Sequence, residues 1–395
     1  MKNAAPRQRD QAERTSSLLI LSCSGGAGHL RAAEALHRTA LAGDLPIRSE
    51  HHDVLDFTSP AFKRLYAGSY LSMVNSAPEL WGYLYHRAER TSYRKDLAIS
   101  LFDRLMYRRY VREIRTRRPD ALVCTHFLPF ISISPFLREM GIPVYAVTTD
   151  FDIHQLWVDP AVTRYSVFHD ESRWQLRSKG IPEERIGVHG IPVMPEFLAL
   201  PSTAAARSRL RIPASALTVL VLSGGFGVGR IDSIVSEILR TLGSFPNRQA
   251  TVLAVCGRND KATARVAALP VPPNVILRPF GFVDNIPELM AASDLLVSKS
   301  GGLTSSEALA SGLPMLIIDP IPGQESRNAD LLVEHGAAWK AVNLANLSYK
   351  LTMLVRDPTL LPRARGAARS LARPNAATEI LTDIVHHLSQ RGDSL

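Results

Sequence analysis

The sequence predicts an α/β protein built from two doubly wound domains, each a parallel sheet covered by helices. Short apolar runs alternate with amphipathic segments of helix length along most of the chain, a pattern typical of βα units. The chain has 395 residues, which exceeds one ordinary hydrophobic core. Each half also begins with an apolar run that leads into a glycine-rich turn, Leu18–Gly28 and Thr218–Gly229.

In the first half, the expected strands are short apolar runs that end in polar or glycine-containing turns. They are Leu18–Ser22, Ala121–Thr125, Pro143–Thr148, Tyr165–Phe168 and Ile186–His189. The expected helices are His29–Ala42, Pro60–Asn75, Arg94–Arg117 and Glu171–Lys179.

The second half repeats the same pattern. Its expected strands are Thr218–Leu222, Thr251–Cys256, Val275–Leu277, Leu295–Ser298 and Pro314–Ile318. A helix is expected at Thr304–Ala310, stopped by Gly312, another from Glu325 to a stop at Gly336, and a terminal one at Asn375–Leu388.

These patterns predict five segments. Residues 1–16 form a disordered tail, 17–195 the N-terminal domain, and 196–206 a linker rich in proline and then in small residues. Residues 207–370 form the C-terminal domain, and 371–395 a final helix and tail.

The composition favours some classes of binding partner but does not identify one. The formal net charge of +9 favours anionic partners such as nucleic acid, acidic lipid surfaces or phosphorylated substrates. The three cysteines lie far apart in apolar runs without metal-ligand spacing, which indicates buried thiols in a reducing compartment.

Glycine turns between a strand and a helix let backbone N–H groups approach an anion. The turn at Ser22–His29 departs from a dinucleotide fingerprint because Arg31 replaces the third glycine, although Asp53 stands at a plausible distance for a ribose acid. No glycine turn is followed by Lys-Ser or Lys-Thr, so a Walker loop is absent from the sequence. A nicotinamide, flavin or P-loop enzyme is therefore disfavoured.

Residues 298–329 fit a nucleotide-sugar better. Glu307 falls early in a helix that follows Gly301 and Gly302, where a carboxylate can accept both ribose hydroxyls while the helix N-terminus faces a diphosphate. Gln324 and Glu325 open the next helix and would lie beside the same pocket, where an amide and a carboxylate suit sugar hydroxyls. Each feature alone is equally compatible with an ordinary polar helix start.

Several motifs in order resemble family 28 glycosyltransferases of the two-domain GT-B architecture. The chain is most similar to the branch of monogalactosyldiacylglycerol synthases and processive diacylglycerol glucosyltransferases. The motifs are SGGAGHLRAAEAL, FKRLYAGSYLSMVNSAPELWGYLYH, TTDFDIHQLWVDPAVTRYSV, VCGRND, GFVDNIPELMAASDLLVSKSGGLTSSEAL and PGQESRNA. One departure is Ala27, where many relatives carry glycine.

The resemblance implies two Rossmann-like domains facing a cleft, with a UDP-sugar held mainly by the C-terminal one. Glu307 matches the ribose ligand, Gln324 and Glu325 the hexose ligands, and Phe282 the position whose backbone meets uracil. The donor-binding residues implied are Gly28, Gly224, Gly225, Gly227, Arg258, Phe282, Ser300, Gly301, Gly302, Thr304, Glu307, Gln324, Glu325 and Asn328.

The implied reaction is an inverting transfer of glucose or galactose from a UDP-sugar to 1,2-diacylglycerol. His29 is the first candidate for the base, since an imidazole suits proton abstraction at neutral pH. Asp150 and His154 form a second candidate pair after an expected strand. No cofactor or metal is expected, because glycine-loop amides and helix N-termini can stabilise the leaving diphosphate.

A basic and aromatic segment between Trp81 and Arg118 is the candidate acceptor side. Basic groups with interfacial aromatics favour a cytoplasmic enzyme attached peripherally to anionic lipids on the cytoplasmic face of a membrane. A solvated basic helix face is the alternative, and no nucleic-acid motif accompanies the patch. The expected contacts are Trp81, Tyr85, Arg108 and Arg109.

Three alternatives remain open. A peptidoglycan-type N-acetylglucosaminyl transferase shares the fold and the nucleotide, but the segment Thr148–Trp157 favours the glycerolipid branch. A UDP-N-acetylglucosamine 2-epimerase shares the architecture, but Pro-Gly-Gln-Glu fits it poorly. A non-catalytic UDP-sugar sensor would keep the donor pocket, and the presence of His29, Asp150 and His154 argues against it.

Overall fold

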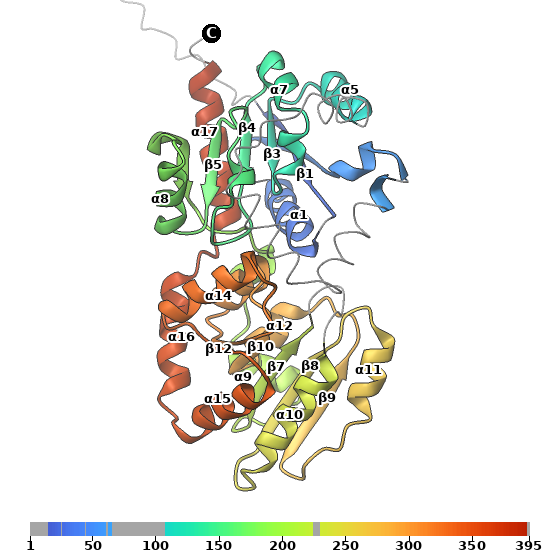
Figure 1. Cartoon of the computed structure of the whole chain (residues 1–395), viewed down its shortest axis with the longest axis vertical. Coiled ribbons are helices and arrows are strands. Elements are labelled where there is room, and N and C mark those ends of the chain that lie inside the picture. The colour runs from blue at the N-terminus through green and yellow to red at the C-terminus, as the bar shows by residue number, and fades with distance from the viewer. Residues whose placement is uncertain are drawn as a thin grey trace, which may run out of the picture.

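The computed structural model describes residues 15–24, 26–43, 45–60, 62–64, 107–223 and 230–392, which form two α/β domains stacked along the long axis of the molecule (Figure 1). The elements of the N-terminal domain are β1 (Ser16–Ser22), α1 (Ala27–Leu41), β2 (Ile47–Asp53), η1 (Val54–Phe57), α5 (Arg108–Arg117), β3 (Ala121–Cys124), α6 (Leu128–Ile131), α7 (Ser134–Met140), β4 (Val144–Val147), η2 (Gln155–Trp157), β5 (Arg164–Val167), α8 (Asp170–Ser178), η3 (Glu183–Arg185) and β6 (Ile186–Val188).

The second domain begins after a short connection. Its elements are η4 (Pro195–Leu198), α9 (Thr203–Arg209), β7 (Leu217–Leu222), α10 (Ile231–Gly243), β8 (Ala250–Val255), α11 (Asp260–Ala267), β9 (Val275–Phe280), α12 (Ile286–Ala291), β10 (Leu295–Ser298), α13 (Gly302–Ala310), β11 (Met315–Ile318), α14 (Gln324–Glu334), β12 (Ala338–Ala341), α15 (Leu344–Arg356), α16 (Leu360–Leu371) and α17 (Ala376–Gly392).

Both sheets have six strands, all parallel. The N-terminal order is β2-β1-β3-β4-β5-β6, and the C-terminal order is β12-β11-β10-β7-β8-β9. Every expected strand corresponds to one of these. The two strands that the sequence did not predict, β2 and β12, are edge strands.

The last helix returns to the first domain. Figure 1 shows α17 beside the N-terminal sheet, and its side chains Ile380, Leu381 and Ile384 are buried in one cluster with Leu18 and Ile20 of β1. Arg164 of β5 donates to Asp383 through Nε and Nη2 at 3.1 and 3.0 Å. The C-terminal helix therefore ties the two domains together.

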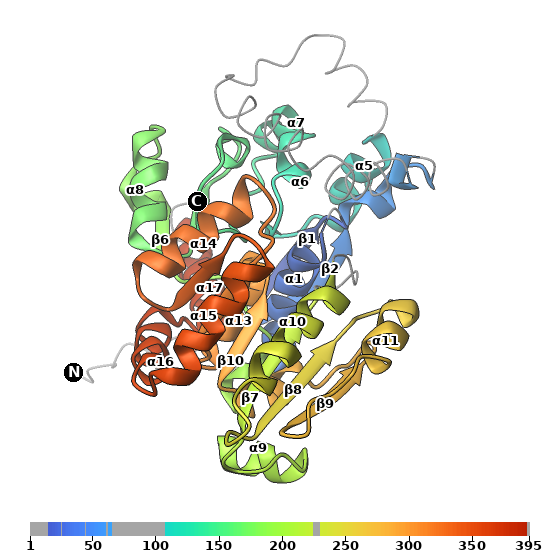
Figure 2. The ribbon, with the colours of Figure 1, turned by 60° about the horizontal axis from the view of Figure 1, so that its bottom comes forward.

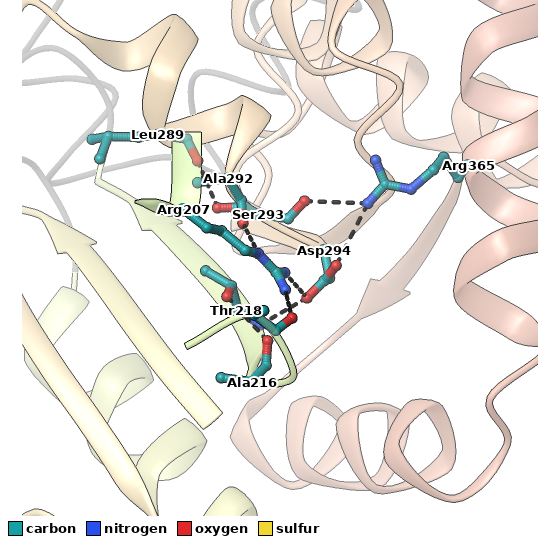
Figure 3. Close-up of polar contacts among 9 residues, drawn as sticks. Arg207, Ala216, Thr218, Leu289, Ala292, Ser293, Asp294 and Arg365 are labelled. Carbon is teal, nitrogen blue, oxygen red and sulfur yellow. Dashed lines mark hydrogen bonds and ion pairs between the residues drawn. The ribbon is translucent and has the colours of Figure 1, made fainter. Parts of the chain in front are cut away.

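The segment predicted as a linker, 196–206, holds most of η4 and the first half of α9. A buried polar cluster anchors α9 to the second sheet (Figure 3). Arg207 is 8% exposed and donates to Asp294 Oδ2 at 2.6 Å, while Thr218 N donates to the same oxygen at 2.9 Å. Arg365 of α16 donates to the Ser293 carbonyl at 3.2 Å. These contacts join α9 and α16 to the amino ends of β7 and β10.

Candidate active site

Each sheet has one point where the strand order reverses, and ligands of doubly wound sheets bind at the carboxyl ends of the strands there. The reversal lies between β1 and β3 in the first domain and between β7 and β10 in the second. The turn before α1 follows β1, and the turn before α13 follows β10. The predicted base His29 thus lies at the reversal point of the first sheet. The predicted nucleotide-binding turn, Gly301 and Gly302, lies at the reversal point of the second sheet.

His29 lies in the first turn of α1 and is held by the strands beside it. Its Nδ1 lies 3.0 Å from the Thr125 carbonyl oxygen and 2.7 Å from Thr149 Oγ1. A carbonyl only accepts, so Nδ1 carries the proton and Nε2 keeps its lone pair. Thr125 Oγ1 donates to the His29 carbonyl at 2.9 Å, which fixes the turn. The ring is thus oriented as a neutral base.

Burial keeps this ring uncharged. It lowers the pKa of His29 to about 4, against a smaller rise from the Thr125 carbonyl. The His126 ring stands edge-on at 4.5 Å between centroids, and burial lowers the pKa of His126 as well. Two neutral imidazole rings therefore lie next to each other at the carboxyl end of β3.

Asp150 follows β4 and faces the second domain. Asn328 of α14 donates from Nδ2 to Asp150 Oδ1 at 3.2 Å and to the Ser300 carbonyl at 3.0 Å, and its Oδ1 accepts from Phe151 N at 2.8 Å. Burial raises the pKa of Asp150 to about 6, although the Asn328 hydrogen bond lowers it. Asn328, predicted as a donor ligand, thus bridges the domains with both ends of its amide.

His154 is placed differently from its predicted partner Asp150. Its Nδ1 accepts from Leu156 N at 3.2 Å, so the side chain caps η2, and the residue is 3% exposed. Because Nδ1 accepts this hydrogen bond, Nε2 carries the proton of the neutral ring, and neither nitrogen offers a lone pair to a substrate proton. His29 and Asp150 therefore remain the two candidate bases.

Glu307 lies on the buried face of α13. The residue is 5% exposed, and burial raises the pKa of its carboxyl to about 7, although Arg31 lowers it. Arg31 Nη2, from α1 of the other domain, lies 3.4 Å from Glu307 Oε1. Sequence reasoning missed this contact, because Arg31 follows only the ordinary polar pattern of an amphipathic helix.

Gln324 and Glu325 begin α14 beside the loop that follows β10. Gln324 Oε1 is buried without a hydrogen-bond partner among the described residues, which fits an oxygen that accepts a hydrogen bond from a ligand hydroxyl. Glu325 Oε2 accepts from Ile321 N at 2.7 Å, and burial raises the pKa of this carboxyl to about 7. Ser300 Oγ donates to the Glu325 carbonyl at 2.6 Å, so Ser300 supports the loop.

The glycines at the start of α13 allow the domains to approach. A Cβ on Gly302 would lie 1.9 Å from the Thr149 carbonyl oxygen, so no side chain fits there. A Cβ on Gly301 would lie 3.5 Å from Glu325 Oε1, and one on Gly28 would lie 3.7 Å from Leu303 Cβ. The first turn of α13, which also carries the half-buried Thr304, therefore lies directly beside α1.

Arg258 and Phe282 lie at the carboxyl ends of β8 and β9. The Arg258 guanidinium stands 4.6 Å from the centre of the Phe282 ring, and Phe282 is 59% exposed. This exposed cation–π pair includes Phe282, the residue whose backbone is predicted to meet the uracil. Gly224, Gly225 and Gly227 lie outside the described residues.

A small pocket opens where the order of the second sheet reverses. Its polar lining residues include Ser223, Arg230, Lys299 and Asp319, and Arg230 Nη2 pairs with Asp319 at 3.2 Å. Sequence reasoning missed Arg230 and Lys299, although both are basic residues directly beside predicted strands or glycine turns. They place positive charge beside the carboxyl ends of β7 and β10.

The basic helix α5 lies at the outer end of the N-terminal domain, beside α7 (Figure 2). Arg108 and Arg109 are exposed on it, whereas Trp81 and Tyr85 lie outside the described residues. Among residues 15–64 and 107–392, apart from their short gaps, no helix is long and apolar enough to cross a membrane. In the same part of the chain, no three His, Cys, Asp or Glu side chains gather as a metal site.

Two family models match this chain in succession. The model described as monogalactosyldiacylglycerol (MGDG) synthase matches residues 29–193. The model described as glycosyltransferase family 28 C-terminal domain matches residues 218–380. Processive diacylglycerol beta-glucosyltransferases from Bacillus cytotoxicus and Bacillus mycoides are each 30% identical over 378 residues, which cover 93% of this chain and 93% of each relative.

Solved structures share the whole fold at low identity. Acinetobacter baumannii MurG superimposes with a TM-score of 0.64 at 15% identity, covering 95% of this chain and 99% of that chain. The S. aureus MnaA–UDP structure gives 0.64 at 12% identity, covering 95% and 97%. Anabaena HepE in complex with UDP and glucose gives 0.53 at 16%, covering 95% and 100%. The predicted GT-B fold is confirmed.

Proposed function

The chain belongs to glycosyltransferase family 28, in the branch of the monogalactosyldiacylglycerol synthases and processive diacylglycerol glucosyltransferases, and we propose that it transfers glucose or galactose from a UDP-sugar to 1,2-diacylglycerol. Membership of this family makes it a glycosyltransferase. The hexose, the inverting course of the reaction and its place at a membrane surface are the parts that we propose.

The proposal rests on one observation: a continuous series of contacts connects the reversal point of the first sheet to that of the second. His29 contacts Thr149, the next residue Asp150 contacts Asn328, and Asn328 contacts Ser300 beside Gly301. A candidate base and the loops that fit a nucleotide-sugar therefore share one boundary between the domains. Such an arrangement suits transfer between a donor in one domain and an acceptor in the other.

In the proposed reaction, the hydroxyl oxygen of diacylglycerol attacks the anomeric carbon of the hexose. The bond from that carbon to the diphosphate oxygen breaks, and its electron pair leaves with UDP. His29 Nε2 takes the hydroxyl proton, since Nδ1 is committed to Thr125. A single displacement inverts the anomeric carbon, so an α-linked donor yields a β-glycoside.

The leaving diphosphate needs positive charge, which the first turn of α13 can provide. Free backbone N–H groups at a helix N-terminus attract phosphate oxygens, and the pocket residues Arg230 and Lys299 add cations nearby. We expect no metal requirement. Turnover should persist in EDTA, and its loss with recovery on adding Mg²⁺ or Mn²⁺ would contradict this expectation.

A pocket between α5 and α7 suits the acceptor side. Its volume is about 330 Å³. Its walls include Tyr107, Val111, Ile133 and Phe136, while its rim carries Arg108, Arg112 and Arg115. Apolar walls with a cationic rim favour contact with acyl chains under anionic headgroups. We therefore propose that this end of the N-terminal domain faces the membrane.

One incubation tests the function directly. The full chain is mixed with radiolabelled UDP-glucose or UDP-galactose and vesicles that contain diacylglycerol, and the lipids are separated by chromatography. A labelled glycolipid from one donor identifies the hexose. Binding of UDP without any labelled lipid would support a sensor, and transfer only to a lipid-linked peptidoglycan precursor would support the alternative transferase.

A further inference from the structure

Arg31 belongs to α1 of the N-terminal domain but contacts the C-terminal domain. Its Nη2 lies 3.4 Å from Glu307 Oε1. The Glu307 side chain is 7% exposed, whereas the Arg31 side chain is 44% exposed. The guanidinium is therefore the more solvent-accessible member of the pair.

The contact leaves both groups with unused hydrogen-bonding capacity. A charge-assisted N–H···O bond is usually about 2.7–2.9 Å long, so a separation of 3.4 Å is a loose pairing. Among the described residues, Arg31 is the one polar partner of this carboxylate. A guanidinium has five N–H donors, and a carboxylate can accept several hydrogen bonds. The pair can therefore hold a third group between or beside its members.

We infer that Arg31 is a further donor-binding residue, which binds the diphosphate of a nucleotide whose ribose is held by Glu307. The chemistry assigns the two roles. Ribose hydroxyls donate to a carboxylate, whereas a guanidinium only donates and so requires the acceptor oxygens of phosphate. This inference rests on the proposed use of a UDP-sugar.

The packing of α1 places Arg31 on the correct side of α13. Gly28 lies against Leu303, so α1 passes beside the first turn of α13, whose backbone N–H groups attract phosphate. Arg31 follows His29 by two residues on the same helix and extends its side chain toward Glu307. The diphosphate would then lie between the candidate base and the ribose carboxylate.

Arg31 would also assist the reaction. When the bond from the anomeric carbon to the diphosphate oxygen breaks, the electron pair adds negative charge to the diphosphate. A guanidinium in contact with it stabilises this charge more in the transition state than in the bound substrate. Arg31 would additionally offset the repulsion between the Glu307 carboxylate and the phosphates.

Calorimetric titration of the full chain with UDP and with uridine tests the inference. Uridine has the ribose but no phosphate. At a pH well above the pKa of Glu307, where this carboxyl is ionised with or without Arg31, Arg31→Gln should weaken UDP binding about tenfold to a hundredfold and leave uridine binding within about twofold. Arg31→Lys keeps the charge but loses the planar fork, so its UDP affinity should be intermediate. At saturating UDP-hexose, Arg31→Gln should also lower kcat.

Other outcomes would overturn the inference. An equal loss of affinity for UDP and for uridine would mean that Arg31 only positions Glu307. A gain in affinity for either ligand would mean that Arg31 blocks the site in the free protein. Arg38→Gln is the matched control, because Arg38 lies on the same helix and pairs with Glu196 at 2.7 Å; both ligands should bind as to the wild type. If the wild type binds no UDP, the proposed function fails, whereas UDP binding that Arg31→Gln leaves unchanged refutes this inference alone.

Discussion

In His29 the engaged nitrogen carries the proton and Nε2 keeps its lone pair, whereas in His154 the engaged nitrogen is the acceptor. His29 Nδ1 contacts the Thr125 carbonyl and the Thr149 hydroxyl, two groups that lie about a hundred residues away in the sequence. His154 uses its Nδ1 for a local cap. Sequence position placed both histidines near a cleft, but the tautomer and the engaged nitrogen depend on packing that no local pattern reveals.

His29→Gln tests the base. Loss of general-base catalysis should lower kcat about 100-fold to 10,000-fold, while UDP affinity stays within about twofold because His29 contacts the first domain. Rates at saturating donor and calorimetric UDP binding provide the two measurements. Near-normal turnover would make Asp150 the leading base.

The pH dependence of kcat/KM for the acceptor, at saturating donor, separates the two candidates further. Burial lowers the pKa of His29 to about 4, so a His29 base is already unprotonated well above that pH and the profile should be flat through pH 6. Burial raises the pKa of Asp150 to about 6, so an Asp150 base would produce a fall below pH 6. Asp150→Asn, which cannot titrate, is the control.

Glu307 should make nucleotide binding depend on pH. Burial raises its pKa to about 7 in the free protein, so the carboxyl is largely protonated below that pH and ionised above it. Only the ionised form accepts both ribose hydroxyls, so uridine affinity should rise about tenfold from pH 6 to pH 8. Uridine avoids titration of a phosphate in this range. A rise that persists in Glu307→Gln would assign it to another group.

The strands show which secondary-structure elements could be predicted from sequence patterns and which could not. Eight of the ten predicted strands are largely buried, and the partly buried edge strands β6 and β9 still begin with apolar residues, whereas β2 reads IRSEHHD and β12 reads AWKA. Both missed strands lie at sheet edges and are only partly buried, so they lack the apolar run that identifies a central strand. Likewise, α17 was predicted as a helix, but its return to the first sheet depends on tertiary packing.

The cluster around Asp294 should contribute stability and not binding. Asp294 directly precedes β10 and accepts from Thr218 near the start of β7 (Figure 3), whereas the candidate nucleotide site lies at the carboxyl ends of these strands. Asp294→Asn leaves Arg207 buried without its anion, which should lower the free energy of unfolding by about 3 kcal/mol. Urea denaturation measures this loss, and UDP affinity of the folded protein should not change.

A matched pair provides the control for that experiment. Asp232→Asn breaks a contact of 2.9 Å with Arg265, whose side chain is 52% exposed. Solvent screens such a pair, so the urea midpoint should move far less than in Asp294→Asn. Equal shifts in the two variants would mean that the buried cluster has no special role in anchoring α9 and α16.

Helix α5 is the element that we expect to meet the membrane. Arg112 is exposed on it and lines the pocket beside α7. Arg112→Glu should weaken binding to vesicles of anionic lipid roughly tenfold, and more at low salt, because each cation near such a surface contributes about 1 kcal/mol. Vesicle sedimentation measures this. Arg248→Glu makes the same charge change at an exposed site of the other domain and should bind as the wild type.

The two domains meet through backbone as well as side chains. The amide of Asn328 bridges Asp150 and Phe151 to Ser300, and Arg31 bridges to Glu307. Beside these contacts the Thr149 carbonyl lies so close to Gly302 that a Cβ would approach within 1.9 Å. The side chains that join base and donor site thus depend on a close approach that only glycine permits.

Gly302→Ala should therefore separate the domains. A backbone oxygen cannot yield as a flexible side chain can, so relief of the overlap must move α13 away from the loop that follows β4. The radius of gyration from small-angle scattering should rise, and kcat should fall at least about tenfold because the base and the anomeric carbon lose their alignment. Gly366→Ala is the control, since a Cβ there meets nothing within 4 Å and the added methyl should stabilise α16 by about 0.5–1 kcal/mol. Unchanged dimensions and turnover in Gly302→Ala would show that catalysis does not require this contact between the domains.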